Sequence, residues 1–364
     1  MTVPAPAWRT AALRLAVGNV DVTRQQRALS DLLERGQDCG PEQVVAALER
    51  HGGCPDADVR RVQRRMAALG ARFVLVGDVQ YPAPLATAWP ELGAPLWLFA
   101  AGGPVRLVTT PAVAIVGTRR PTLDGLRTAR TLATALARAG VVVVSGLARG
   151  IDQEAHRAAL DAGGDTIAVL GTGFGVDYPG GSATLRAAIA DHGALLTELA
   201  PGAGPRPWQF LARNRIISGL AAATVVVEGG PTSGALQTAR LAAGQGRDVW
   251  AVPGSINAQN SQAPLALLRD GASLLTSVDD LLDSLALSRS CAAGVTGAAA
   301  DGGTPPTALS ADARLILSLL GAVPATTDEL VAASRLPAHA AMVAIGELVE
   351  AGCGVTTPSG VVRA

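Results

Sequence analysis

The sequence predicts an α/β fold built on a doubly wound, mostly parallel sheet of the extended Rossmann-like type. Between residues 104 and 288, short apolar runs alternate with amphipathic stretches of helical spacing. Strands that are apolar on both faces and separated by helices form parallel sheets covered on both sides. Right-handed crossovers then bring the carboxyl ends of the strands to one edge. The expected strands are residues 113–116, 141–144, 166–170, 194–196, 224–227 and 248–252.

Smaller segments flank this domain. Residues 1–70 carry apolar residues three or four apart, which predicts a helical module of the SAM or helix-hairpin-helix kind. Residues 71–103 form a connector with two short strand-like runs, and residues 289–308, rich in Gly, Ala and Thr, predict a linker. Residues 309–364 have the order of a winged-helix domain. Its would-be recognition helix, 338–350, is mostly apolar, so we do not expect this domain to bind duplex DNA strongly.

The composition restricts the chemistry. All 30 basic residues are arginine, so phosphate contacts must come from guanidinium or backbone N–H groups. The formal net charge is zero, which gives no global basic field. With no signal-peptide pattern and no apolar run of about 18 residues, we expect a cytoplasmic protein. We also expect no metal, because the cysteines are too widely spaced for a zinc site: Cys39, Cys54, Cys291 and Cys353. No cofactor is expected either, because the motifs of a nicotinamide or flavin site are missing.

The residues that follow the expected strands are small or basic. Glycine-rich turns that open helices let backbone N–H groups approach an anion, and six of them on one edge predict an anionic ligand. Arg119 and Arg120 follow the first strand and Arg149 the second. Such a row of arginines suits a polynucleotide better than a single phosphate. The nearby aromatic residues, which could stack on bases or simply pack in the core, are Phe174, Trp208 and Phe210.

A dinucleotide site is not expected. It requires GxGxxG after the first strand and an acid at the end of the second, but here the first turn is GTRRPT and the second strand ends in Ser145. No GxxxxGK[ST] loop is present, and no nucleophile has a convincing base beside it. A carboxylate pair formed by Glu198 and Glu228, which end adjacent candidate strands, remains open.

Several strings together resemble the DNA-processing protein A family (DprA, also called Smf). They include VAIVGTRRPT at 113–122, SGLARGID at 145–152 and RNRIISGL at 213–220. The resemblance implies a protein that binds single-stranded DNA without catalysis and loads RecA recombinase onto it in natural transformation. It also implies a homodimer, and single-strand-binding protein is a further expected partner. One departure is the string SQAPLALL at 261–268, where the family carries a Gly and an Asn, so we assign no contact there.

The resemblance implies a DNA pocket formed by Gly117, Arg119, Ser145, Gly146, Arg149, Phe210, Arg213 and Asn214. Other residues at the strand ends complete the predicted site: Thr118, Arg120, Leu147, Gly173, Phe174, Ser233 and Gly234. Two alternatives stay open. One is a nucleotide hydrolase of the lysine-decarboxylase-like Rossmann group, although Gln237 stands near the position where those enzymes carry a catalytic glutamate. The other is a sensor of a small phosphorylated ligand.

Overall fold

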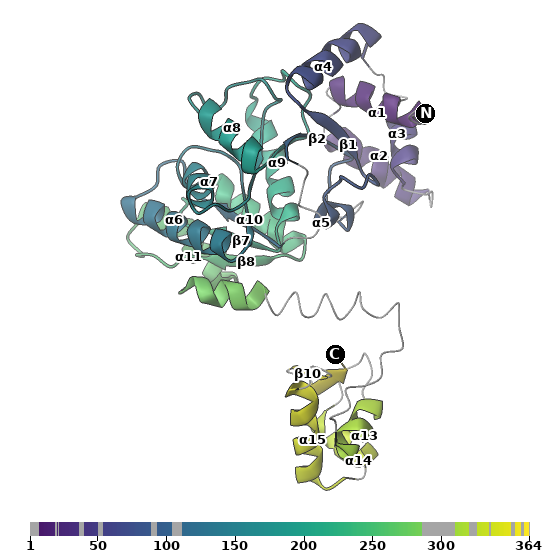
Figure 1. The fold of residues 1–364 in the computed structure, drawn as a ribbon, viewed down its shortest axis with the longest axis vertical. Helices are drawn as coiled ribbons and strands as arrows, with labels where there is room; N and C mark the ends of the chain where they lie inside the picture. The colour runs from purple at the N-terminus through teal and green to yellow at the C-terminus, as the bar shows by residue number, and fades with distance from the viewer. Residues whose placement is uncertain are drawn as a thin grey trace. The chain divides into compact units, whose positions relative to one another are not determined.

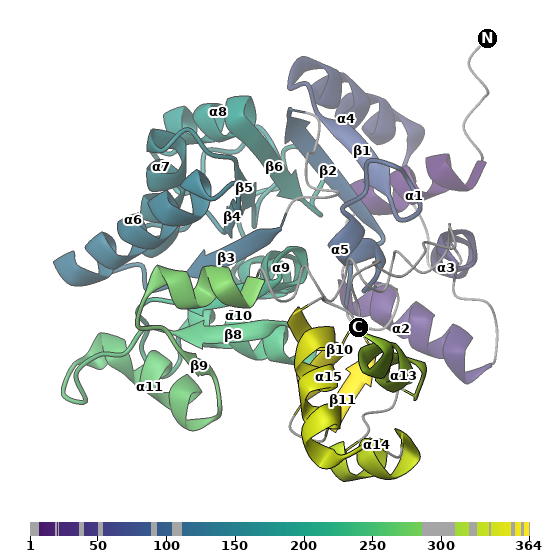
Figure 2. The ribbon, with the colours of Figure 1, turned by 60° about the horizontal axis from the view of Figure 1, so that its bottom comes forward.

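The chain divides into two compact units, Met1–Leu285 and Ala286–Ala364 (Figures 1 and 2). The computed structural model describes residues 7–18, 20, 22–35, 40–49, 54–88, 93–103, 111–285, 310–319, 326–334, 336–350, 354–357 and 360–363. The expected linker and three of the cysteines (Cys39, Cys291 and Cys353) lie outside these residues. Among the described helices, none combines the length and apolarity that a membrane crossing requires.

A nine-stranded sheet forms the centre of the first unit, in the order β1-β2-β6-β5-β4-β3-β7-β8-β9. The strands are β1 (Arg72–Leu75), β2 (Trp97–Gly102), β3 (Ala112–Val116), β4 (Val142–Ser145), β5 (Thr166–Val169), β6 (Gly193–Thr197), β7 (Ala223–Val226), β8 (Asp248–Ala251) and β9 (Ser273–Leu274). The seven strands β6-β5-β4-β3-β7-β8-β9 are parallel to their neighbours in the sheet. Strand β2 is antiparallel to both β1 and β6. The doubly wound, mostly parallel fold is therefore confirmed. The segment expected to be a connector adds two strands, because β2 pairs with β6.

Helices cover both faces of the sheet. On one face lie α5 (Ala83–Ala86), α9 (Pro207–Leu220), α10 (Gly234–Gly244) and α11 (Gln262–Arg269), packed on the side of the strands that carries Val144 and Val169. The other face carries α6 (Leu123–Arg138) and α7 (Ile151–Asp161) over Val113 and Val143. Further along this second face, α8 (Ala183–His192) packs near Ala168.

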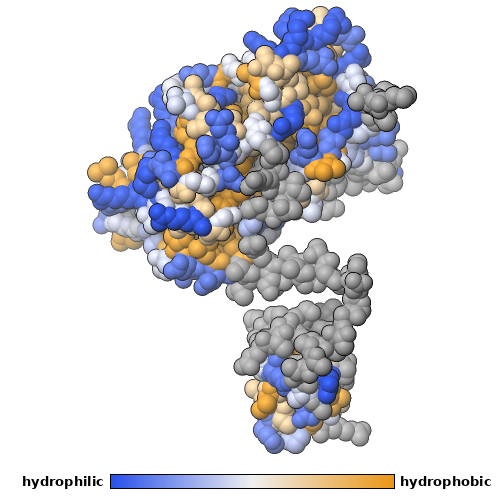
Figure 3. Space-filling model, in the orientation of Figure 1, coloured by the Kyte–Doolittle hydropathy of each residue, from blue (hydrophilic) through white to orange (hydrophobic). Residues whose placement is uncertain are grey.

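The N-terminal helices complete the cover of the second face. They are α1 (Ala7–Val17), α2 (Val22–Glu34), α3 (Pro41–Glu49) and α4 (Asp56–Ala68). Their apolar residues, such as Leu15 and Leu48, share one core cluster with Trp97 and Phe99 of β2. Hydrophilic residues cover most of α4, at the top of the view in Figure 3. The exposed side chains of α4 include Arg60.

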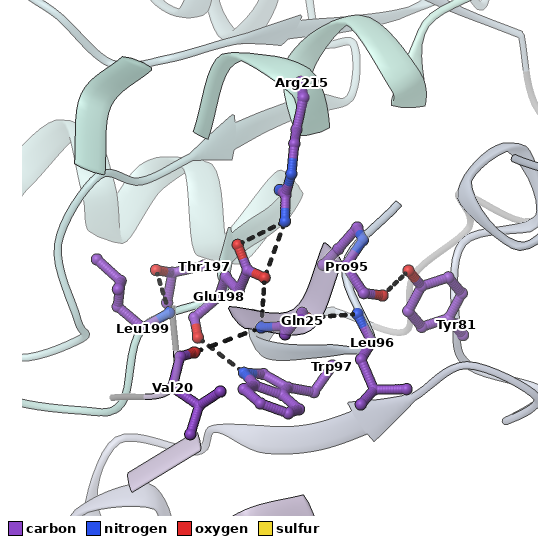
Figure 4. Close-up of polar contacts among 10 residues, drawn as sticks. All are labelled: Val20, Gln25, Tyr81, Pro95, Leu96, Trp97, Thr197, Glu198, Leu199 and Arg215. Atoms are coloured by element: carbon purple, nitrogen blue, oxygen red, sulfur yellow. Dashed lines mark hydrogen bonds and ion pairs between the residues drawn. The ribbon is translucent and has the colours of Figure 1, made fainter. Parts of the chain in front are cut away.

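A polar network also fastens this helical module to the sheet (Figure 4). The Gln25 amide of α2 donates to a Glu198 carboxylate oxygen at 3.1 Å, at the end of β6. Arg215 of α9 donates from Nη2 to both oxygens of that carboxylate at 2.9 Å. The indole N–H of Trp97 donates to the Glu198 carbonyl at 3.1 Å. Since the Arg215 and Glu198 side chains are only 7% and 14% exposed, this is a buried junction between α2, β2, β6 and α9.

The second unit has the predicted winged-helix order of elements. They are α13 (Ala311–Leu319), α14 (Thr327–Ser334), α15 (Ala338–Glu350) and the antiparallel pair β10 (Gly354–Thr357) and β11 (Gly360–Arg363). Ile316, Leu330 and Leu348 form its small core. The side chains that α15 leaves exposed include Met342 and Val343, and these are apolar rather than basic.

Candidate functional site

A cleft opens beyond the carboxyl ends of β3, β4, β5 and β7. It consists of two hollows of about 950 and 450 Å³. The residues that line both hollows are Arg119, Arg120, Ala148, Tyr178, Phe210 and Arg213. The chain continues from β3 towards β4 but from the neighbouring β7 towards β8, so the cleft lies at the topological switch point of the sheet. Ligands of open α/β sheets bind at this position.

Two glycines allow the turn after β3 to pack directly on the start of α7. A Cβ atom on Gly117 would lie 2.5 Å from the Ile151 side chain. Gly150 has φ of +88°, and a Cβ there would lie 2.5 Å from the Thr118 carbonyl oxygen. Ile151 N donates to that same carbonyl at 3.3 Å. The turns after β3 and β4 are therefore held against each other, which brings their arginines to one cleft.

Three of these arginines are exposed and have no acidic partner. The guanidinium groups of Arg119, Arg120 and Arg149 line the cleft, and none forms an ion pair with any residue that the structure describes. The nearby acids are engaged elsewhere: Asp124 with Arg127, Glu154 with Arg130, and Asp152 with the backbone N–H groups of Gly146 and Ala148. These charges are consequently available to an anionic ligand.

An aromatic pair stands beside the arginines. The rings of Tyr178 and Phe210 have centroids 5.0 Å apart with an interplanar angle of 38°. The Arg119 guanidinium carbon lies 5.9 Å from the centre of the Phe210 ring, within cation–π range. Both rings are half-buried and line both hollows of the cleft. Gly171 makes room for Phe210, since a Cβ there would lie 2.5 Å from the ring. Tyr178 was not among the residues predicted from the sequence to form the site.

Arg213, also predicted to bind DNA, forms part of the floor of the cleft. It is 7% exposed, and its Nη1 donates to the carbonyls of Gly146, at 2.8 Å, and Val169. Burial lowers the pKa of Arg213 to about 10, against the opposing effect of Asp152. At neutral pH the group is therefore a buried cation that joins the turns after β4 and β5.

Several other predicted residues build the walls of the site. Ser145 is buried and donates from Oγ to the Ile115 carbonyl at 2.6 Å. Leu147 is 1% exposed with φ of 58° and packs in the core cluster that contains Trp97 and Phe99, so it does not line the cleft. On the opposite wall, Asn214 Nδ2 donates to the Gly234 carbonyl at 3.3 Å, and the Ser233 hydroxyl caps α10 by accepting from Leu236 N. Asn260, which the sequence did not single out, also lines the cleft.

Two further predicted residues, both in the turn after β5, do not reach the cleft either. Phe174 is 3% exposed and packs in the core cluster that contains the N-terminal helices. Gly173 is buried against the backbone of Ala200, where no Cβ would fit. The placement of both residues at the cleft was therefore wrong. The glycine-rich turn predicts an accessible ring, whereas in the fold Phe174 belongs to a core cluster that includes Leu15 and Leu48, more than 100 positions away in the chain.

The fold and the cleft define a Rossmann-like protein that offers a row of unpaired arginines at its switch point. The chain belongs to the DNA recombination-mediator protein A family, whose model matches residues 72–286, and the model of the DprA winged helix domain matches residues 300–348. The family predicted from the motifs is thereby confirmed.

Individual relatives agree. A DNA processing protein DprA of Mycobacterium tuberculosis is 40% identical over 294 residues, covering 76% of this chain and 71% of the relative. DprA of Streptococcus pneumoniae is 37% identical, covering 72% and 93%. The X-ray structure of S. pneumoniae DprA matches with a TM-score of 0.63 and 32% identity, over 78% of this chain and 98% of that one. A structure of Helicobacter pylori DprA, reported for its single-stranded DNA binding mode, matches with a TM-score of 0.52 and 28% identity, over 60% and 97%.

Proposed function

We propose that this chain binds single-stranded DNA in the cleft at the switch point. The observation that carries the proposal is the row of exposed Arg119, Arg120 and Arg149, which no described acid neutralises. Guanidinium groups bind phosphate oxygens in a fork geometry that a row of such groups repeats along a backbone. Phe210 and Tyr178 stand where a base would stack, which a single strand allows and a duplex does not. The H. pylori relative, described as a single-stranded DNA binder, supports the assignment.

The remaining residues of the cleft have supporting roles in this proposal. The backbone of Gly117 and Thr118, and that of Gly146, approaches the phosphates, with the buried Arg213 charge below. Asn214, Ser233 and Gly234 form the wall opposite the arginine row. The strand is held mainly through its backbone, so binding shows little sequence preference.

We further propose that binding serves recombination rather than turnover. The family resemblance supports a protein that loads RecA recombinase onto the bound strand during natural transformation, acts as a homodimer in the cytoplasm and meets single-strand-binding protein. Catalysis is not part of the proposal. The Glu228 carboxylate accepts hydrogen bonds from Thr122 N, Thr122 Oγ1 and Asn260 Nδ2. Its role is therefore structural, since it holds the turn after β3 to the segment that carries Asn260. Glu198 is held by Arg215 and lines the hollow beside the N-terminal helices, which Glu228 does not line.

This engagement of the carboxylates disfavours the hydrolase alternative. A general base needs a free lone pair within reach of the reacting group. The small-ligand sensor is disfavoured by size, because a hollow of about 950 Å³ joined to one of about 450 Å³ exceeds the needs of a single phosphorylated metabolite.

The test is to measure the affinity of the full chain for labelled oligonucleotides, single- and double-stranded, across a salt series. Single-strand binding through several phosphates predicts that log K falls with log [salt], with a slope of roughly −0.7 for each phosphate contact. A flat salt dependence, or equal affinity for the duplex, would refute the proposal. A matched experiment with a nucleoside triphosphate in place of DNA tests the two alternatives.

A further inference from the structure

A second, smaller hollow adjoins the cleft between the N-terminal helices and α9. Its volume is about 190 Å³, and its lining includes Ala16 and Val20 of the helical module, Glu198 after β6, and Trp208 and Ala212 of α9. We propose that this hollow holds one pyrimidine base of the strand that lies in the cleft. The inference rests on the proposed single-strand binding and deepens it by naming a base subsite.

The hollow is placed to receive part of the same ligand. Arg206 lines both this hollow and the larger part of the cleft, and Leu170 lines both it and the smaller part. Arg213 lines all three. The exposed Arg206 guanidinium thus stands at the passage between them, where it can bind the phosphate of a nucleotide whose base turns aside from the cleft.

The size and the walls of the hollow select the ligand. An apolar cavity of about 150 Å³ accommodates benzene, so about 190 Å³ admits a single six-membered ring with its substituents but not a second base. Ala16, Val20 and Ile216 provide apolar walls that are almost fully buried. Trp208, 43% exposed, provides an aromatic surface beside them. Of the two lining arginines, Arg213 is buried and Arg206 is exposed where the hollow meets the cleft. The apolar interior of the hollow therefore suits a planar, mostly apolar ring rather than a phosphate.

The polar group of the hollow also favours a base. The Glu198 carboxylate accepts two hydrogen bonds from Arg215 and one from Gln25 (Figure 4). A carboxylate has about four lone-pair positions, so one remains for a further donor. It repels an anion, but it accepts from the exocyclic amine of cytosine, or from the ring N–H of thymine. Gln25 also donates to the Val20 carbonyl at 3.4 Å, so one side chain connects the carboxylate to the apolar wall.

The experiment compares two oligonucleotides of equal length and charge: an oligo(dT) and the same backbone with abasic residues throughout. The protein is the full chain with Ala212→Met, which fills the hollow from a position that does not line the cleft, and Ala135→Met is the matched control on α6. We expect Ala212→Met to weaken oligo(dT) binding by roughly 5- to 150-fold, the range for stacking of one base, and to leave the abasic affinity unchanged. Ala135→Met should alter neither.

A second variant guards against misfolding of the first. Trp208→Ala removes an exposed side chain, so the fold should be kept, and it should give the same selective loss of oligo(dT) binding. If both variants bind oligo(dT) like the wild type, or lose both oligonucleotides equally, the base subsite is refuted while single-strand binding stands. If the wild type binds neither oligonucleotide, the proposed function itself fails and the subsite with it.

Discussion

Removing the three exposed arginines of the cleft gives the most direct measure of how the ligand is held. The triple variant Arg119→Ala, Arg120→Ala, Arg149→Ala takes away three cations that no described acid neutralises. Each phosphate contact to a single strand contributes roughly 0.7 to the slope of log K against log [salt], so the slope should become shallower by about 2.1. Between 50 and 200 mM salt, a four-fold change, the affinity ratio of wild type to variant should therefore shrink by about 18-fold.

The assay is fluorescence anisotropy with a labelled single strand at several salt concentrations. The control is a second triple variant, Arg60→Ala, Arg64→Ala, Arg138→Ala, which removes the same charge from exposed positions outside the cleft. The control should keep the wild-type slope. Equal slopes in the wild type and the cleft variant would show that these arginines do not touch phosphate. Equal loss in both variants would show that only the overall charge matters.

Three further predictions address the aromatic pair and the buried groups. Phe210→Leu should weaken single-strand binding by about 1–3 kcal/mol at unchanged salt slope, measured in the same anisotropy assay, because it removes a stacking surface but no charge. Glu198→Ala should lower the free energy of unfolding in urea by about 3–5 kcal/mol, since it leaves a buried arginine without its partner, whereas Asp124→Ala, at an exposed pair, should change it by less than about 1 kcal/mol. His156 is fully buried, which lowers its pKa to about 3, so the unfolded chain binds more protons there between about pH 6.5 and 3. Stability should fall as the pH drops through this window by up to about 1.4 kcal/mol per unit more than in His156→Gln, and parallel urea-melt curves for the two proteins would contradict this.

The sequence predicted the sheet well because its signal is local. An apolar run such as 113–116 is buried on both faces whatever lies elsewhere in the chain, and the turn that follows it must lie at the switch edge. The exposed arginines were predictable for the same reason. Arg119 and Arg149 each follow the carboxyl end of a strand, which places them at the switch edge. Their strands, β3 and β4, are parallel neighbours, so the two arginines lie close together.

The remaining features depend on contacts between distant segments. Phe174 and Tyr178 belong to the same turn, yet the first packs under the N-terminal helices and the second faces the cleft. Nothing in the local string separates them. Similarly, the small hollow is lined by Ala16 and Val20 together with residues of α9, about 190 positions later in the chain. A hollow of the size of one base forms only where the two modules pack together. The hydrophobic periodicity of either module alone therefore cannot predict it.

Arginine has two physically different roles around this cleft, and burial separates them. Arg119 and Arg149 keep their guanidinium groups in water, where they cost little to hold and are free to meet a ligand. Arg213 and Arg215 have lost that water, and each repays the desolvation with directed hydrogen bonds: Arg213 to two carbonyls and Arg215 to one carboxylate. A lysine ammonium lacks the planar fork that makes such paired contacts rigid. A chain whose cations are all arginine can therefore build both the floor that fixes the turns and the rim that binds phosphate from a single residue type.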